Sequence, residues 1–148
     1  MTAGFAMTVS SELIQFLGSL VAILALAGIA RWLKLGRNPT LADDVAGMTA
    51  AAEAVDGFEA VAQARDLHGL GAILRDGSGR VLVLKPHGSH FAGRILTGAA
   101  KATVWQDLQH RGLYVDCGER RFGGVYLEID QPEAWVEAIN RLGSPRDA

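Results

Sequence analysis

The feature that most constrains this chain is an apolar stretch near its start. Residues 13–30 contain no charged side chain. At ~1.5 Å per residue, a helix over residues 13–33 would be ~31 Å long, close to the ~30 Å hydrocarbon core of a bilayer. The sequence therefore predicts one transmembrane helix over residues 13–33. Its predicted anchor residues in lipid include Leu13, Leu20, Leu24 and Ile29, and Arg31, Trp32 and Lys34 are predicted to lie at the membrane interface.

Two other interpretations of this stretch, a cleavable signal peptide and a buried core helix, fit the residues less well. A signal peptide begins with a positively charged region, whereas residues 1–15 contain no Lys or Arg and one acid, Glu12. A core helix normally keeps a polar stripe, whereas leucine, isoleucine and valine surround the axis here. We therefore expect the segment to act as a membrane anchor.

The residues that flank the stretch predict its orientation. Basic residues close to a transmembrane helix stay on the cytoplasmic side, and Arg31, Lys34 and Arg37 all follow the apolar residues. We therefore expect a single-pass protein of the inner (plasma) membrane, with a short tail, residues 1–12, outside and the C-terminal domain in the cytoplasm. The single Cys117 agrees with a reducing compartment, because a disulfide needs two cysteines.

The part of the chain after Arg37 has the size and charge of one ordinary domain. It comprises roughly 110 residues, enough for one hydrophobic core. It contains eleven Lys and Arg against fifteen Asp and Glu, a net charge of −4. Proteins that bind nucleic acid are usually basic, so we expect no nucleic-acid partner, and any contact with an anion has to be local.

A linker and a juxtamembrane amphipathic helix are predicted over residues 34–57. Thr40, followed three residues later by Asp43, resembles a capping box with Asp in place of Glu. We expect the helix to end near Gly57 and to pack its apolar stripe on the following domain or, alternatively, to dock a partner through it. The stripe consists of Leu41, Val45, Met48, Ala52 and Val55, which share one helical face.

The following region predicts β-strands, because short apolar runs alternate with Gly, Asp and His turns. The segment Asp76 to Gly79 is typical of a hairpin turn. The run Val81 to Leu84 indicates a strand that is buried on both faces. Seven strands are predicted, over residues 58–65, 70–75, 80–85, 91–97, 101–107, 113–117 and 123–129.

A C-terminal helix is predicted after these strands. Pro132 suits its first turn, Asp130 or Gln131 can cap it, and Gly143 ends it. Trp135 is the predicted core anchor, because an aromatic residue on an amphipathic helix can cover the open end of a sheet structure. The apolar face consists of Trp135, Val136, Ile139 and Leu142.

Seven strands followed by one helix, with Trp135 inside the run 133–139, resemble the pleckstrin-homology-like fold over residues 58–142. The resemblance implies a seven-stranded antiparallel barrel, residues 58–143. Together with the two helices predicted before it, we expect an α+β protein in which a transmembrane helix and an amphipathic helix precede this barrel. The C-terminal helix would cap the barrel, and residues 144–148 would form a tail. The whole chain is also similar to short bacterial membrane proteins of uncharacterised function.

The resemblance implies a binding module for phospholipid headgroups, peptides or proteins. The loop between the first two predicted strands departs from the basic motif that recognises phosphoinositides, since it offers only Arg65 and His68 beside Asp66. We therefore expect a protein partner.

The sequence shows no motif for catalysis, cofactor binding or metal binding, so we expect a non-enzymatic protein with no cofactor and no metal. His87 and His90 could ligate a metal only if folding brought them to Cys117 or Asp116. We expect both histidines to be surface or turn residues and Cys117 to be a small core residue. An enzyme with an unrecognised site is the less favoured alternative.

Arg120, Arg121 and Phe122 form the candidate partner-binding tip, at a predicted hairpin between the last two strands. Arginine can present a planar fork to a carboxylate or phosphate, and Phe122 could insert into a partner surface. In the alternative interpretation, one arginine pairs with Glu119 or Asp116 and Phe122 fills the barrel mouth. The tip predicts binding or scaffolding at the membrane.

Small residues within the predicted transmembrane helix offer a different function. Gly18, Ala22 and either Ala25 or Gly28 share one face and permit close approach of a second helix. This pattern would support a homodimer. It would also support the alternative function of a single-helix accessory subunit of a multisubunit membrane complex.

Overall fold

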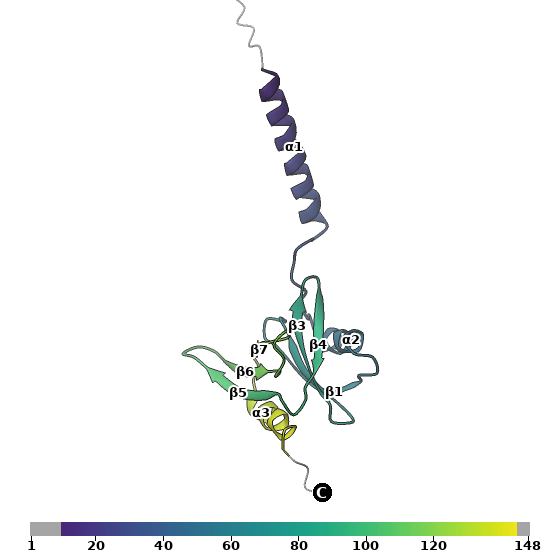
Figure 1. Ribbon diagram of the computed structural model, residues 1–148, viewed down its shortest axis with the longest axis vertical. Coiled ribbons are helices and arrows are strands. Elements are labelled where there is room, and N and C mark those ends of the chain that lie inside the picture. The colour runs from purple at the N-terminus through teal and green to yellow at the C-terminus, as the bar shows by residue number, and fades with distance from the viewer. Residues whose placement is uncertain (1–9, 145–148) are drawn as a thin grey trace, which may run out of the picture. The chain divides into compact units, whose positions relative to one another are not determined.

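The computed structural model describes residues 10–144. The chain divides into two units, residues 1–37 and residues 38–148, of which the first contains one helix and the second an α+β domain (Figure 1). The outer parts of the two expected tails, residues 1–9 and 145–148, lie outside the described residues.

The helix of the first unit, α1 (Ser11–Trp32), has a defined cap at each end. The side chain of Ser10 accepts a hydrogen bond from the backbone N–H of Leu13 at 3.3 Å. At the other end, the N–H of Leu35 donates to the carbonyl of Ala30, the bond that defines a Schellman motif. The predicted helix is confirmed, with its ends displaced by one or two residues.

The composition of α1 also agrees with the sequence prediction. Its mean hydropathy reaches 2.3, and none of its side chains is buried within the chain. Among the described residues it is the one helix long and apolar enough to cross a membrane, criteria that a signal sequence near an N-terminus also meets. The structure therefore contains a single candidate transmembrane helix.

The short helix of the second unit, α2 (Asp44–Ala54), begins later than predicted. The side chain of Asp43 accepts the N–H of Ala46 at 2.7 Å, so Asp43 is the N-cap, and the predicted capping box at Thr40 is wrong.

The predicted apolar stripe is wrong for Val45, Met48 and Ala52, whereas its two end members, Leu41 and Val55, pack against the domain core as predicted. The buried residues of the helix are Gly47 and Ala51, because only the smallest side chains let the helix backbone approach the sheet beneath it closely. The larger Val45 and Met48 are 69% and 42% exposed, and Ala52 is exposed as well. The helix is therefore held by its small face, and its larger apolar side chains point to solvent.

All seven predicted strands are present, in two antiparallel sheets (Figure 1). The first sheet has the order β1-β2-β3-β4 and the second has the order β5-β6-β7. Among the described residues no strand pairing joins the two sheets, so they are not closed into one barrel, and the predicted seven-stranded barrel is unconfirmed. The strands are β1 (Ala60–Arg65), β2 (Ala72–Asp76), β3 (Val81–His87), β4 (His90–Ile95), β5 (Lys101–Gln106), β6 (Arg111–Asp116) and β7 (Gly124–Leu127).

The first sheet is buried on both faces. Ile73 and Val83 belong to a core shared with the second sheet and the C-terminal helix. Leu74 and Leu82 belong to a second core, which α2 covers. The prediction that the run Val81 to Leu84 is buried on both sides is confirmed, since none of its four residues is more than 1% exposed.

The turn between β2 and β3 is held by a buried carboxylate, at the predicted hairpin. Asp76 accepts the backbone N–H of Ser78 at 3.0 Å and of Arg80 at 2.9 Å, and the Arg80 Nε at 2.6 Å. Desolvation raises the pKa of Asp76, but the hydrogen bonds from Ser78 and Arg80 outweigh it and lower the pKa to about 2. The carboxylate is therefore ionised at neutral pH.

The C-terminal helix, α3 (Pro132–Arg141), is anchored mainly by Ile139, which is fully buried. Trp135 packs against the same core but is only half-buried, so it is a secondary contact rather than the predicted anchor. Gln131 occupies the N-cap position without a side-chain cap bond. The helix therefore covers one side of the core through an aliphatic residue.

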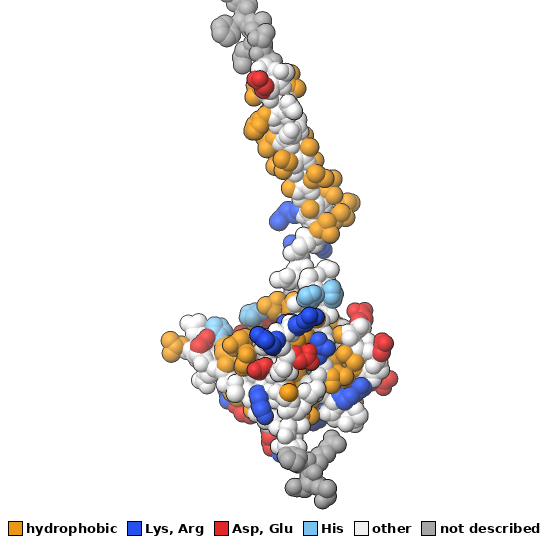
Figure 2. All heavy atoms as spheres, viewed as in Figure 1, with side chains coloured by type: hydrophobic (Ala, Val, Ile, Leu, Met, Phe, Trp, Pro, Cys, Tyr) orange, Lys and Arg blue, Asp and Glu red, His pale blue; other side chains and the backbone are white. Residues whose placement is uncertain are grey.

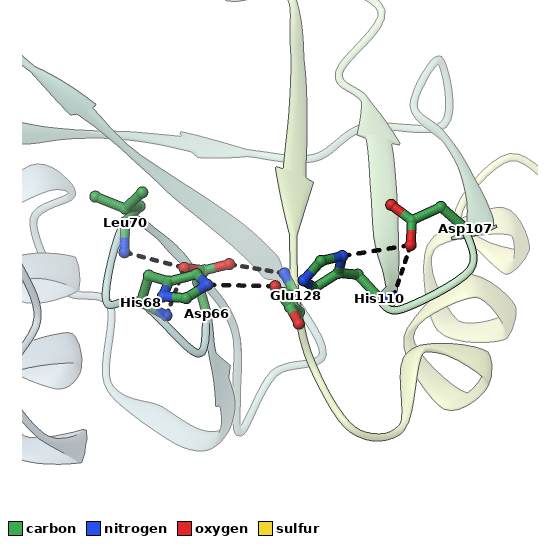
Figure 3. A network of polar contacts seen from close by, with 6 residues as sticks. All are labelled: Asp66, His68, Leu70, Asp107, His110 and Glu128. Atoms are coloured by element: carbon green, nitrogen blue, oxygen red, sulfur yellow. Dashed lines mark hydrogen bonds and ion pairs between the residues drawn. The ribbon is translucent and has the colours of Figure 1, made fainter.

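Asp66 connects the two sheets at one end of the domain (Figure 3). It lies in the turn after β1 and is 5% exposed. Its Oδ2 accepts the N–H of His68 at 3.0 Å and of Leu70 at 3.3 Å, and its Oδ1 accepts the N–H of Glu128, just after β7, at 2.7 Å. One carboxylate therefore satisfies three backbone donors from two sheets.

Replacing Asp66 with Ala should lower the free energy of unfolding by about 3 kcal/mol, because three backbone donors lose a buried acceptor. Asp107→Ala is the matched control. It removes the bonds to the N–H groups of Gln109 and His110 in an exposed turn, where water can replace the carboxylate, so the loss should stay below about 1 kcal/mol. Urea denaturation of the full chain in detergent, followed by circular dichroism, measures both; equal losses would contradict the role of Asp66.

Candidate functional site

The predicted partner-binding tip lies in the loop between β6 and β7. The loop closes through a hydrogen bond from the N–H of Gly123 to the carbonyl of Glu119 at 2.8 Å. Arg120 and Arg121 are exposed, and neither forms an ion pair with any residue that the structure describes. Both guanidinium groups are therefore available to an external anion.

Phe122 belongs to the core and is only 7% exposed. The Nζ of Lys85 lies 4.4 Å from the centroid of its ring, and the Cζ of Arg94 lies 5.6 Å away, which are cation–π contacts. The ammonium group of Lys85 also donates to the carbonyl of Phe122. Phe122 is therefore held inside the domain, as in the alternative interpretation, and only the two arginines of the predicted tip are exposed.

The β3–β4 hairpin brings further cations to the same surface. Its register pairs Lys85 with Ala92 and His87 with His90, and places Arg94 opposite Val83. Because side chains alternate along a strand, Lys85, His87, His90 and Arg94 share one face of the hairpin. We define the basic face as these residues together with the loop arginines: Lys85, His87, His90, Arg94, Arg120 and Arg121.

Acidic residues lie within the basic face and reduce its charge. The Oε2 of Glu119 lies 3.1 Å from the Nε of Arg94. Asp116 lies nearby and accepts the N–H of Gly118 at 2.9 Å. In the space-filling view, blue side chains gather beside pale blue histidines on one part of the domain, with red side chains among them (Figure 2). Four permanent cations against two acids leave the face positive, although the domain carries a net charge of −4.

Cys117 lies at the base of this region and is 3% exposed. Desolvation, together with the charge of Asp116, raises the pKa of its thiol to about 11, and Lys85 opposes this only in part. The thiol is therefore protonated at neutral pH. The prediction that Cys117 is a small core residue is confirmed.

Alkylation should report this state of Cys117. With a pKa of about 11, only about one thiol in a thousand is ionised at pH 8, and the thiolate is the reactive form. We expect iodoacetamide to modify the folded chain at least about tenfold more slowly than the urea-unfolded chain, whose cysteine has an ordinary pKa near 8.5. Mass spectrometry of timed samples measures both rates. Equal rates would show that Cys117 is accessible in the native domain.

The two histidines of the basic face do not belong to a metal cluster. Their rings lie edge to face with centroids 5.6 Å apart. Across residues 10–144, no group of three or more His, Cys, Asp and Glu side chains is placed to hold a metal ion. His87 and His90 therefore contribute to the basic face as exposed hairpin residues.

Two further histidines pair with acids near Asp66 (Figure 3). His68 Nε2 lies 3.4 Å from Glu128, and His110 Nδ1 lies 3.3 Å from Asp107. An adjoining hollow of about 250 Å³ carries both signs of charge. Its arginines are already engaged, Arg65 with the carbonyl of Leu41 and Arg111 with Glu133. The residues that line the hollow are Arg65, Leu67, Arg111, Glu128, Ile129 and Asp130.

The sequence did not single out Lys85 and Arg94 as site residues. Their contribution depends on the register of the β3–β4 hairpin, which begins at the Gly88-Ser89 turn with Gly88 at φ +62°. A turn with Gly at its first central position is typical of a two-residue hairpin. Placing that turn in the sequence would have aligned both cations with His87 on one face.

Over residues 38–144, the fold is an α+β domain with two antiparallel sheets, two helices and the positively charged basic face. Comparison of the chain with protein-family models, with curated proteins and with solved structures finds no match. A function for this domain therefore has to be inferred from its own residues and their geometry.

Proposed function

We propose that the chain is a single-pass protein of the inner membrane that presents a small, non-enzymatic binding or scaffolding domain in the cytoplasm. The observation that carries the proposal is that Arg120 and Arg121, on the positive face of an otherwise acidic domain, are exposed and form no ion pair with a residue in the range 10–144. The order of four strands, three strands and a helix supports a pleckstrin-homology-like domain, in an open form.

The proposed membrane anchor is α1. Its length, its hydropathy and its lack of buried side chains all fit a lipid environment. Arg31, Lys34 and Arg37 follow it, and basic residues at one end of a transmembrane helix favour cytoplasmic placement of that end. The anchor would keep the domain at the cytoplasmic surface of the membrane.

Extraction and proteolysis test this anchor and its orientation. Because α1 would be buried in hydrocarbon, the intact chain should stay in the pellet after a sodium carbonate wash of membrane vesicles. Protease added outside sealed spheroplasts should leave the C-terminal domain intact and digest it after lysis. Release of the intact chain by carbonate would exclude the anchor, and digestion in sealed spheroplasts would reverse the orientation.

The proposed ligand of the basic face is a protein partner that carries carboxylates. Arginine forms short, bidentate hydrogen bonds with carboxylates, and such charge-assisted bonds are stronger than neutral ones. Membrane anchoring would raise the effective concentration of the domain for a partner in the same membrane or at its surface. Modest contacts at Arg120 and Arg121 would then suffice for association.

Substitution of Arg120 and Arg121 by Ala should remove the specific partner from a pull-down of the tagged full chain in mild detergent. We expect its recovery to fall about tenfold or more, since losing one or two charge-assisted bonds changes affinity by at least that factor. The charge-matched control is Arg75→Ala with Arg141→Ala, two exposed arginines outside the basic face. An unchanged set of partners in the tip variant would exclude the proposed site.

A single-helix accessory subunit is the second candidate function. Gly18, Ala22 and Ala25 recur at i, i+4 and i+7 and so share one face of α1, where a second helix or a second copy could approach closely. The same pull-down separates the two candidates. An accessory subunit would keep its partner in the arginine variant and lose it when Ser11–Trp32 is replaced by an unrelated transmembrane helix.

A further inference from the structure

The two sheets have four edge strands, and an exposed edge strand can pair with another chain. The edge of β5 is blocked at one position by Asn140, whose side-chain amide accepts the N–H of Ala102 and donates to its carbonyl, both at 3.0 Å. The edge of β1 is irregular, with a register shift between Ala60 and Ala62. The edge of β7 is four residues long, and Asp66 binds the N–H that follows it.

Strand β4 differs from these three edges. It has six residues and pairs with β3 in an unbroken register, with no irregularity. Among the described residues, no strand or side chain forms a hydrogen bond along its other side. Among the described residues, β4 is therefore the long, regular edge on which no hydrogen bond blocks an added strand.

The hydrogen-bond phase identifies the free groups on this edge. The N–H of Leu96 donates to the carbonyl of Val81 at 2.7 Å. Hydrogen-bonded and non-hydrogen-bonded pairs alternate along an antiparallel ladder, so the backbone groups of residues 90, 92 and 94 face β3. Pro86, which lacks an N–H, falls in a non-hydrogen-bonded pair, as this phase requires. The edge presents the N–H and carbonyl groups of Phe91, Gly93 and Ile95.

The two sides of this edge differ in chemistry. On one side Arg94 and His90 belong to the basic face, next to the loop that carries Arg120 and Arg121. On the other side α2 approaches so closely that a Cβ on Gly93 would lie 2.7 Å from the Cβ of Ala54. A hollow of about 380 Å³ lies between α2 and the β3–β4 turn, where this edge begins; its lining is Pro39, Ala50, Glu53, Ser89, His90 and Phe91.

We propose that β4 binds an extended segment of the partner protein by strand addition, with acidic side chains at alternate positions. The proposal rests on the proposed function and names the partner chemistry of the same surface. Side chains of an added strand alternate between the two sides of the sheet. Those on one side meet Arg94, His90 and the loop arginines, which favours carboxylates. Those on the other side meet α2 and the hollow beside Phe91, which favours small apolar side chains.

Two other kinds of segment fit the β4 edge less well. A basic strand would place like charges beside Arg94, and like charges opposite each other in a sheet are unfavourable. An acidic residue in the opposite register would face Glu53, which lines the hollow. In the preferred segment, acidic residues therefore alternate with small apolar residues along the sequence.

The test uses the full chain in detergent and a labelled synthetic peptide of alternating Asp and Val. Fluorescence anisotropy should detect binding that weakens as salt is added. The matched peptide of alternating Asn and Val should bind about tenfold more weakly, because it forms no charge-assisted bonds. On binding, amide hydrogen exchange should slow at Phe91, Gly93 and Ile95 and stay unchanged along β7. Absence of binding, equal binding of both peptides, or protection only outside β4 would overturn the proposal.

A substitution on the edge provides a second measurement. Ile95→Pro removes one outward N–H without touching the bonds to β3, and should abolish peptide binding. Ile95→Val keeps the N–H and should bind like the wild type. Circular dichroism checks that both variants fold; where the proline variant does not, the exchange pattern of the wild-type complex decides. Peptide binding retained by a folded Ile95→Pro variant would exclude strand addition.

Failure of strand addition can be distinguished from failure of the proposed function. A partner that is lost from the Arg120→Ala, Arg121→Ala variant but kept by a folded Ile95→Pro variant would leave the binding function in place and reject the β4 edge. A partner kept by both variants would reject both proposals. Binding of anionic lipid vesicles in place of the Asp and Val peptide would assign the basic face to a membrane surface and reject a protein strand.

Discussion

Burial of the first sheet on both faces is the constraint around which the domain is arranged. Leu82 and Leu84 face the core beneath α2, and Val81 and Val83 face the core shared with the second sheet and α3. One strand, β3, therefore contributes to two separate cores. Because β3 is fixed from both sides, the hairpin that extends from it is held in a defined position, and the basic face is built on that hairpin.

The sequence predicted the elements that depend on local pattern. The uncharged residues 13–30 predicted α1, and the apolar run Val81 to Leu84 predicted two-sided burial. It did not predict the packing face of α2. Gly47 and Ala51 are buried there because their side chains are small, and small size gives no strong hydrophobic pattern in the sequence. A pattern of large apolar residues predicts burial only where the partner surface leaves room for them. The sheet beneath α2 leaves no room for large side chains between itself and the helix.

The candidate site was predicted in part for a similar reason. Arg120 and Arg121 stood out because they are adjacent in the sequence, whereas Lys85 and Arg94 come together through strand register. Both cations lie over the ring of Phe122, which also packs in the core. Contacts across strands are set by the tertiary fold. The sequence alone therefore identified Arg120 and Arg121 but not Lys85 and Arg94, which lie beside them in the folded domain.

The cations near β4 bear on two problems of an open edge strand. An exposed edge invites association with other copies, and charged side chains on or beside the edge are a common means of preventing it. In two of the antiparallel registers in which two β4 edges could pair, Arg94 would lie opposite Arg94 or His90 of the second copy, and two arginines opposite each other are unfavourable at close range. The same charges attract a strand of opposite sign. One arrangement of Arg94, Arg120 and Arg121 would thus disfavour pairing of two β4 edges and favour the proposed acidic partner, because both effects follow from the sign of the charge beside a free backbone edge.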